Sequence, residues 1–378
     1  MTWKYIQPTE IVFGSDALEK LPEITEETGG RRGILVTSPS QIRNGAAELI
    51  KQKTEGKIIR VFSDVRPNPD ILECRMVSEL IREVHADFII ALGGGSALDT
   101  AKAAAVFSQG DKTAGEYYHH PSEMPQSGLP LIAIPTTAGT GSEVTGVAVI
   151  SNRGEGTKKS IVSKQFFPNY ALVDPQLTWS VPSAVTASTG MDVLCHALEG
   201  YWSVNHQPVS DALAVQALKT VFQYLPQLHE DPQNHYAREK MSEASLLAGL
   251  AFALPKTSAP HACSFPLTTH LGIPHGEACA MTVSQFLLFN AVGEKDGRIA
   301  ALAGELGMTS PEQLAVRIEE LKILLGLRRD LSSFNLSDDD IQLLAEESRL
   351  PNLKNNPVPV RHSDIVSILH RLNRKMAG

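Results

Sequence analysis

The chain has 378 residues, 42% of them hydrophobic and 20% charged, with a formal net charge of -8. A chain of this length is typically built as two domains, and this composition lets each domain bury a core without disulfide bonds. The acidic balance disfavours a nucleic-acid-binding protein, which typically carries a basic face. It is compatible with an anionic small-molecule substrate, because a single local lysine can bind one.

The four cysteines are scattered along the chain without a C-x-x-C pair, at positions Cys74, Cys195, Cys263 and Cys279. This spacing is typical of reduced thiols rather than of a zinc ribbon or a disulfide framework. The N-terminal residues lack the apolar core of a signal peptide. No stretch reaches the ~18 apolar residues that a transmembrane helix needs. We therefore expect a cytoplasmic protein that does not interact with membranes.

The first half of the chain alternates short apolar runs with segments of helical periodicity. Strands are predicted at residues 33–37, 57–62, 87–92 and 131–134, and helices at 71–84 and 98–107. Such alternation indicates crossover connections and a mainly parallel, Rossmann-like α/β sheet.

Helical periodicity dominates from residue 183 onward. Helices are predicted at residues 186–201, 211–225, 237–253, 277–291, 296–306, 311–325 and 337–348, and a last one begins at 363. The sequence pattern changes near Pro182, from alternating strands and helices to helices alone. We therefore expect an α/β domain over residues 1–182 and an all-α domain over residues 183–378.

Two loops in the first half suit a nucleotide. The glycines of Gly93-Gly94-Gly95-Ser96 follow a predicted strand and precede a predicted helix, so a phosphate can approach the backbone at the helix N-terminus. The second loop, 135–143, carries hydroxyls and glycines directly after another strand. Each loop alone is equally compatible with a tight turn or a capped loop. Both lie at carboxyl ends of strands, where α/β sheets bind ligands, and together they predict a dinucleotide site.

Four side chains in the second half suit a divalent metal. Asp192 and His196 are four residues apart, so a helix places both on one face. His261 and His275 follow, and Pro274 and Gly276 restrict the backbone around the second of them. Each histidine alone is more typical of a buried, hydrogen-bonded side chain. One carboxylate with three imidazoles suits Fe2+ or Zn2+.

Several motifs are shared with one known family. They are GGGSALDTAK from Gly93, PTTAGTGSE from Pro135, GMDVLCH from Gly190 and GIPHG from Gly272, with FGSDALEKLP from Phe13 and NNPVP from Asn355 near the two ends. In this order and spacing they resemble the iron-containing (group III) alcohol dehydrogenases. The resemblance implies a dehydroquinate-synthase-like architecture, with a metal in the cleft between the two domains and, often, a homodimer.

The resemblance also implies roles for individual residues. The metal ligands are then Asp192, His196, His261 and His275. The NAD or NADP diphosphate is contacted by Gly94, Gly95, Ser96 and Asp99, and the adenine and ribose path is lined by Thr136, Thr137, Thr140 and Ser142. Lys158 reaches the cofactor from a hairpin and Leu177 packs near it. The implied activity is reversible hydride transfer between the cofactor and a small aldehyde or primary alcohol, with the metal polarising the substrate oxygen.

The chain departs from the family pattern at three places. Ser38 stands where an acidic residue often holds the adenosine ribose, so NADP becomes acceptable. Phe265 stands where a second histidine often relays protons, which leaves water, the cofactor ribose or His270 as carriers. Lys256 precedes His261 by five residues, where relatives often have small apolar residues.

Lys256 is the best clue to the substrate. If its charge points toward the metal, it favours an aldehyde carrying a phosphonate, phosphate or carboxylate, and the segment resembles relatives that reduce phosphonoacetaldehyde. The alternative is a solvated loop lysine. Two other functions compete with an oxidoreductase: a lyase of the dehydroquinate-synthase type, and a protein that binds nucleotide or metal without turnover. The lyase needs several basic residues, and only Lys256 is near the ligands in sequence.

Overall fold

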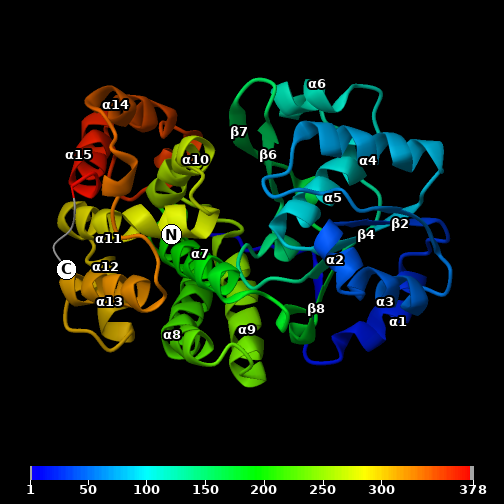
Figure 1. Cartoon of the computed structure of the whole chain (residues 1–378), viewed down its shortest axis with the longest axis horizontal. Helices are drawn as coiled ribbons and strands as arrows, with labels where there is room; N and C mark the ends of the chain where they lie inside the picture. The colour runs from blue at the N-terminus through cyan, green and yellow to red at the C-terminus, as the bar shows by residue number, and fades with distance from the viewer. Residues whose placement is uncertain (1, 375–378) are drawn as a thin grey trace. The chain divides into compact units, whose positions relative to one another are not determined.

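The structure is a computed structural model that describes residues 2–374. Its contacts divide the chain into two compact units. The first comprises residues 6–137 and 141–180 and is called the α/β unit. The second comprises the rest of the described chain and is called the helical unit. Figure 1 shows the elements of each unit.

The α/β unit is built on a six-stranded sheet with every neighbouring pair parallel, in the order β1-β8-β5-β4-β2-β3. The strands are β1 (Glu10–Phe13), β2 (Gly33–Thr37), β3 (Ile58–Phe62), β4 (Phe88–Gly93), β5 (Leu131–Pro135) and β8 (Tyr170–Val173). The central strands are buried along their whole length, which explains their continuous apolar sequence. This sheet confirms the predicted Rossmann-like fold.

Helices cover both faces of this sheet (Figure 1). They are α1 (Leu21–Glu27), α2 (Pro39–Arg43), α3 (Ala46–Lys53), α4 (Ile71–Glu83), α5 (Gly95–Phe107) and α6 (Ala114–His119). Successive residues of β2 pack on opposite faces of the sheet. Ile34 packs in the core with α4 and α5, whereas Leu35 packs in the core with α1 and α3. A two-stranded hairpin of β6 (Val147–Asn152) and β7 (Thr157–Val162) lies outside the main sheet.

The helical unit holds the remaining helices, which confirms the predicted all-α half. They are α7 (Ser183–Trp202), α8 (Pro208–Glu230), α9 (His235–Phe252), α10 (Ala259–Leu271), α11 (His275–Gly293), α12 (Arg298–Glu305), α13 (Pro311–Leu324), α14 (Asp338–Glu347) and α15 (His362–Leu372). The long helix α7 is buried over most of its length, and one core joins it to α8, α9, α11 and α13. A second core joins α10 and α11 to α14 and α15.

No helix among the described residues is long and apolar enough to cross a membrane. The four cysteines are free thiols, and all four are buried.

Candidate functional site

Helix α7 carries the first two predicted ligands. Asp192 and His196 lie one turn apart, and both side chains are buried. Gly190 lets α8 pack closely against the helix interior, because a side chain at this position would collide with Leu225 of α8 at 2.5 Å. Close packing of α7 against α8 therefore fixes the helix that presents the carboxylate.

Helices α10 and α11 carry the other two. His261 lies in the first turn of α10, and His275 is the first residue of α11, directly after Pro274. At Gly276 a side chain would meet the main-chain oxygen of Ser188 on α7 at 1.9 Å. The backbones of α7 and α11 are thus in direct contact at this point, and this contact brings His275 to Asp192.

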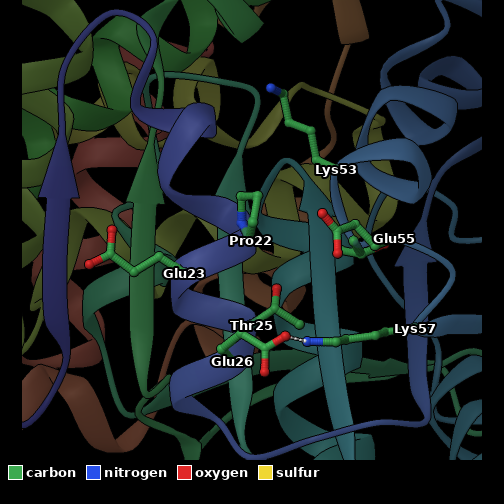
Figure 2. Close-up of a pocket in the computed structure, with 8 residues that line it drawn as sticks. Pro22, Glu23, Thr25, Glu26, Lys53, Glu55 and Lys57 are labelled. Carbon is green, nitrogen blue, oxygen red and sulfur yellow. Dashed lines mark hydrogen bonds and ion pairs between the residues drawn. The ribbon is translucent and has the colours of Figure 1, made fainter.

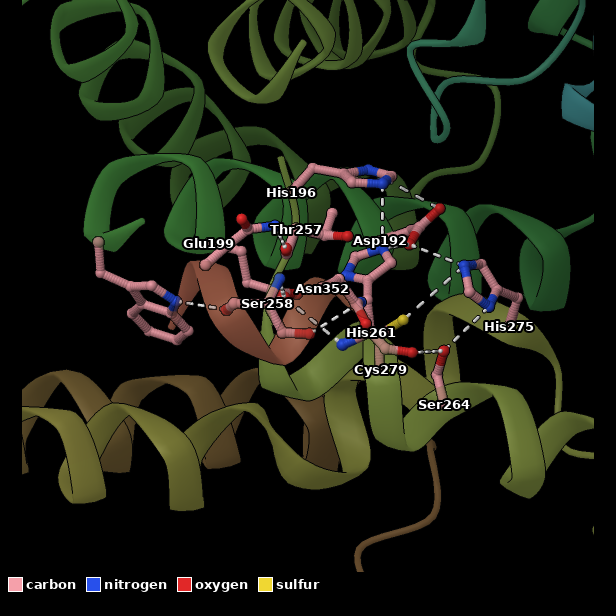
Figure 3. A network of polar contacts seen from close by, with 12 residues as sticks. Asp192, His196, Glu199, Thr257, Ser258, His261, Ser264, His275, Cys279 and Asn352 are labelled. Atoms are coloured by element: carbon pink, nitrogen blue, oxygen red, sulfur yellow. Dashed lines mark hydrogen bonds and ion pairs between the residues drawn. The ribbon is translucent and has the colours of Figure 1, made fainter. Parts of the chain in front are cut away.

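The four side chains converge, as Figure 3 shows. The Nε2 atoms of His196 and His261 are 3.0 Å apart. Oδ1 of Asp192 lies 3.5 Å from Nε2 of His261 and 3.9 Å from Nε2 of His275. Nδ1 of His196 lies 3.9 Å from Oδ2 of Asp192. Sequence positions that span three helices therefore form one compact cluster.

This cluster has the chemistry of a cation site. Oδ1 of Asp192 is buried and has no hydrogen-bond partner among the described residues, which is costly unless a cation satisfies it. Two imidazole nitrogens bound to one ion at about 2.1 Å, at a right angle, lie about 3 Å apart, as Nε2 of His196 and His261 do. The residues therefore fit the divalent metal that the sequence predicts.

The protonation states of Asp192 and His196 agree with metal binding. Burial raises the pKa of Asp192, but the three histidines outweigh it and hold this pKa well below its usual range. Burial lowers the pKa of His196 to about 4, although Asp192 opposes the shift. An ionised carboxylate and a neutral imidazole are the forms that donate electron pairs to a metal.

Cys279 also lies beside the cluster, although it is not among the ligands that the sequence predicts. Its thiol lies 3.9 Å from Nε2 of His275, and potential ligand atoms of Asp192, His261, His275 and Cys279 all lie within 4.8 Å of one another. The sequence feature that could have identified Cys279 is its position four residues after His275, one turn along α11. Burial raises the pKa of this thiol, which favours its protonated form.

Phenylalanine rings pack on two of the three histidines. Phe252, the last residue of α9, stacks on His196 with ring centroids 4.1 Å apart. Phe265 stacks on His275 with centroids 6.1 Å apart. The ring that replaces the family's second histidine therefore packs on a predicted ligand and has no proton to exchange.

Lys256 belongs to the loop between α9 and α10. Its backbone has the left-handed φ of 69°, its N–H donates to the Phe252 oxygen at 2.8 Å, and its ammonium donates to the Ala253 oxygen at 2.5 Å. Burial lowers the pKa of Lys256 to about 8. The side chain is therefore half-buried and tied to the end of α9, and its predicted contact with the substrate stays a prediction.

His270 lies elsewhere on the helical unit. It follows His261 by nine residues on α10, which is about 13 Å along the helix axis. Its side chain is exposed, and Nε2 lies 2.6 Å from the carboxylate of Glu347 at the end of α14. The structure thus gives His270 a surface ion pair, and its predicted role as a proton carrier stays a prediction.

In the α/β unit the two predicted nucleotide loops lie side by side. Gly93 ends β4 and pairs with Pro135, the end of β5, and the Thr136 N–H donates to the Gly93 oxygen at 3.0 Å. A side chain at Gly94 would meet the Thr137 hydroxyl at 3.2 Å. Helix α5 begins at Gly95, so the N–H groups of Gly95 and Ser96 open its first turn. This edge of the sheet offers the donors that a diphosphate needs.

Asp99 and Ser142 are hydrogen-bonded to each other, and their predicted contact with the cofactor stays a prediction. The Ser142 hydroxyl donates to Asp99 at 2.6 Å, and the Val149 N–H donates to the other carboxylate oxygen at 2.8 Å. The fully buried Lys102 donates to Ser142 at 2.6 Å and to the Val147 oxygen at 3.0 Å. These residues therefore tie the second loop and the β6–β7 hairpin to α5.

The remaining predicted cofactor residues lie on several different elements. Ser38 precedes α2 at the carboxyl end of β2, and its hydroxyl lies 2.8 Å from that of Ser40. The Lys158 ammonium donates to the Asn68 side chain at 2.8 Å. Leu177 lines a hollow of about 400 Å³ in the α/β unit. Thr140 falls with the helical unit.

A second hollow, of about 220 Å³, is drawn in Figure 2. It is lined by α1 and by the segment before β3, which is the amino-terminal side of the sheet strands. Its two lysines pair with acidic neighbours, Lys57 with Glu26 and Lys53 with Glu19. The predicted nucleotide residues follow the opposite, carboxyl ends of the strands, so this hollow is separate from that site.

Glu143 yields a prediction about stability. It is buried beside Lys102, and burial raises its pKa from 4.5 to about 7. A carboxyl with a raised folded pKa costs no stability below pH 4.5; the cost grows as pH rises and is complete above about pH 7. We expect Glu143→Gln to stabilise the protein by about 2–3 kcal/mol at pH 8 and little at pH 5. Denaturant unfolding at both pH values measures this; equal effects, or no gain beyond the exposed control Glu48→Gln, would contradict it.

Two family descriptions match the sequence. A family described as iron-containing alcohol dehydrogenase matches residues 8–175. The C-terminal part of the Fe-containing alcohol dehydrogenase family matches residues 186–373. Together these matches cover nearly the whole chain, and they favour neither the lyase nor the non-catalytic alternative.

Individual relatives agree with this. A crystal structure of sulfoacetaldehyde reductase from Bifidobacterium kashiwanohense in complex with NAD+ is 46% identical, covers 99% of both chains and has a TM-score of 0.95. Long-chain-alcohol dehydrogenase 1 of Geobacillus thermodenitrificans is 34% identical and covers 94% of this chain and 93% of its own. Sulfoacetaldehyde reductase of Bilophila wadsworthia is 29% identical over 98% of each chain.

Proposed function

Because the chain belongs to the iron-containing alcohol dehydrogenase family, we propose that it reduces a small anionic aldehyde to the primary alcohol with NADH or NADPH. The aldehyde is of the sulfoacetaldehyde or phosphonoacetaldehyde kind, a two-carbon carbonyl compound with an anionic oxyacid group. The observation that carries the proposal is the half-buried Lys256 in the loop that leads to His261. The similarity to two sulfoacetaldehyde reductases supports the same substrate class.

The metal in this proposal is held by Asp192, His196, His261 and His275. The family description names iron, and four protein ligands leave room for a substrate oxygen only above tetrahedral coordination, which suits Fe2+. The bound metal supplies Lewis-acid polarisation of the carbonyl oxygen, and the reduced nicotinamide supplies the hydride. The carbonyl carbon receives that hydride and the oxygen receives a proton.

The protein's own contribution is to hold the reactants. Lys256 neutralises the anionic group of the aldehyde, which orients the carbonyl toward the metal ligands. Phe252 and Phe265 exclude water from two sides of the histidines. With Phe265 in place of a titratable residue, the proton comes from water, from the cofactor ribose or through His270.

The α/β unit holds the cofactor in this proposal. Gly94, Gly95 and Ser96 at the start of α5 bind the diphosphate, and Thr136, Thr137 and Leu177 line the adjoining path. Asp99 and Ser142 support these loops through their mutual hydrogen bond. Lys158 lies on β7 of the hairpin that they anchor. Ser38 carries no negative charge to repel a 2′-phosphate, so NADPH is accepted as well as NADH.

An aldehyde panel tests the proposed function. Metal-free protein is reconstituted with Fe2+ or Zn2+ and assayed with NADH and NADPH against sulfoacetaldehyde, phosphonoacetaldehyde and the neutral propionaldehyde. We expect kcat/KM for at least one anionic aldehyde to exceed that for propionaldehyde by about 10-fold or more, because a hydrogen bond to a charged group is worth about 1.5–3 kcal/mol. A preference for the neutral aldehyde would overturn the assignment of the substrate class.

Two further properties belong to the proposal. We infer a cytoplasmic location, because all four cysteines are buried free thiols. We also infer a homodimer, as in many iron-containing alcohol dehydrogenases. Light scattering on the purified protein measures the second property directly.

A further inference from the structure

Helix α7 carries a third acidic or imidazole side chain on the face of Asp192 and His196. Glu199 follows Asp192 by seven residues and His196 by three, so all three lie on one side of the helix. Glu199 is fully buried. A buried carboxylate is costly unless every oxygen is paired, so its partners indicate what it does.

Both oxygens of Glu199 contact the start of α10 (Figure 3). One oxygen forms a short contact with Nδ1 of His261. The other accepts from the Ser258 N–H at 2.6 Å, from the Ser258 hydroxyl at 3.1 Å and from the His261 N–H at 3.5 Å. A single carboxylate therefore holds the ring of a predicted ligand and the backbone that carries it.

This carboxylate also takes the place of a helix cap. Ser258 is the N-cap residue of α10, but its own side chain makes no capping hydrogen bond to the helix. Its hydroxyl instead accepts from the Trp202 indole N–H at 2.8 Å and donates to Glu199. The first N–H groups of α10 thus depend on Glu199 from α7.

The contact with His261 fixes the ring's tautomer. A carboxylate can only accept, so the proton of neutral His261 must be on Nδ1, and the lone pair is on Nε2. Nε2 is the atom that lies 3.0 Å from Nε2 of His196 and 3.5 Å from Asp192. Nδ1 of His261 thus faces Glu199, and the lone pair of Nε2 faces the cluster.

We infer that Glu199 is a positioning residue that sets the tautomer and orientation of His261 and thereby raises the affinity of the cluster for its metal. The inference rests on the proposed metal ligands. It does not depend on the substrate, because metal affinity and tautomer are measured without aldehyde or cofactor. Hydrogen bonds to the outer nitrogen of a ligating histidine typically change metal affinity by about 10–100-fold.

The test is Glu199→Gln, which keeps the side chain's shape. If the glutamine oxygen retains the Ser258 N–H, its NH2 group faces Nδ1 of His261, so the imidazole proton must move to Nε2. We expect Zn2+ affinity, measured by competition with a chromogenic chelator, to fall about 10–100-fold. Glu277→Gln is the matched control: it removes another buried carboxylate, which pairs with Arg328 on the same unit at 2.9 Å. Its Zn2+ affinity should stay within about twofold.

A second measurement decides the matter even if Glu199→Gln does not fold. Histidine 15N spectra of the metal-free wild-type protein report each ring's tautomer, and the His261 signal is identified by its loss in His261→Ala. The inference requires the proton on Nδ1. A neutral ring whose single proton is on Nε2 would overturn it, as would a folded Glu199→Gln protein with wild-type Zn2+ affinity. Failure of the aldehyde panel with these results intact would count against the substrate alone.

Discussion

His275→Ala is expected to lower metal occupancy and to reduce kcat/KM by about 1,000-fold or more. His275 is one of the four proposed ligands on three helices, and its Nε2 lies 3.9 Å from both Oδ1 of Asp192 and the Cys279 thiol. Polarisation by a bound metal contributes several kcal/mol to the transition state, and each 1.36 kcal/mol is tenfold in rate. Elemental analysis of the dialysed protein and steady-state kinetics measure the two effects.

His270→Ala is the matched control for this experiment. It removes an imidazole from the adjoining helix α10 that pairs with Glu347 at the surface. Metal content should therefore be retained. Reduced turnover with full metal content would support His270 as a proton carrier, whereas unchanged turnover would leave water and the cofactor ribose. A His275→Ala protein with full metal content and full activity would refute the ligand assignment.

Lys256→Gln is expected to separate anionic from neutral substrates. The ammonium is half-buried and already donates to the Ala253 oxygen, so it is held in place before an anion binds. Losing a hydrogen bond to a charged group costs about 1.5–3 kcal/mol, which is about 10–100-fold in kcat/KM for sulfoacetaldehyde or phosphonoacetaldehyde. Propionaldehyde should change by less than about threefold.

The pH dependence gives an independent check on Lys256. Burial lowers its pKa to about 8, so the cation is present below this pH and is lost as the pH rises through it. The wild-type preference for anionic aldehydes should therefore decline above pH 8, and Lys256→Gln should lack this decline. Lys240→Gln, which removes a lysine of α9 that pairs with Glu243, should behave as the wild type. Equal losses for anionic and neutral aldehydes would remove Lys256 from substrate binding.

The sequence predicted those parts of the fold where local pattern and burial agree. The apolar runs that became β2, β4 and β5 are buried on both faces, and a run of that kind needs little tertiary context to be identified. By contrast β1 and β8 have four residues each, too few to show a period. Helix α10 contains Pro266, and we did not predict it because proline normally ends a helical pattern.

The residues of the candidate site were likewise predictable only where the local sequence pattern was sufficient. The residues that converge in the helical unit were identified from type and spacing, since Asp192 and His196 share a helix face and Gly276 follows His275. Cys279 and Glu199 were missed because their importance depends on which helix packs against which. Nothing in the spacing between Glu199 and His261, which are 62 positions apart, indicates that their side chains touch. Asp99 and Ser142 were assigned to the cofactor, and the structure shows that they also pair with each other.

The contact at Gly276 has a consequence for how relatives diversify. Because main chain meets main chain there, any side chain at this position would push α11 away from α7 and separate His275 from Asp192. The geometry of the proposed metal ligands is thus set by the packing of α7 against α11. If the loop around Lys256 selects the aldehyde as proposed, mutations there can change the substrate without altering the arrangement of the proposed ligands.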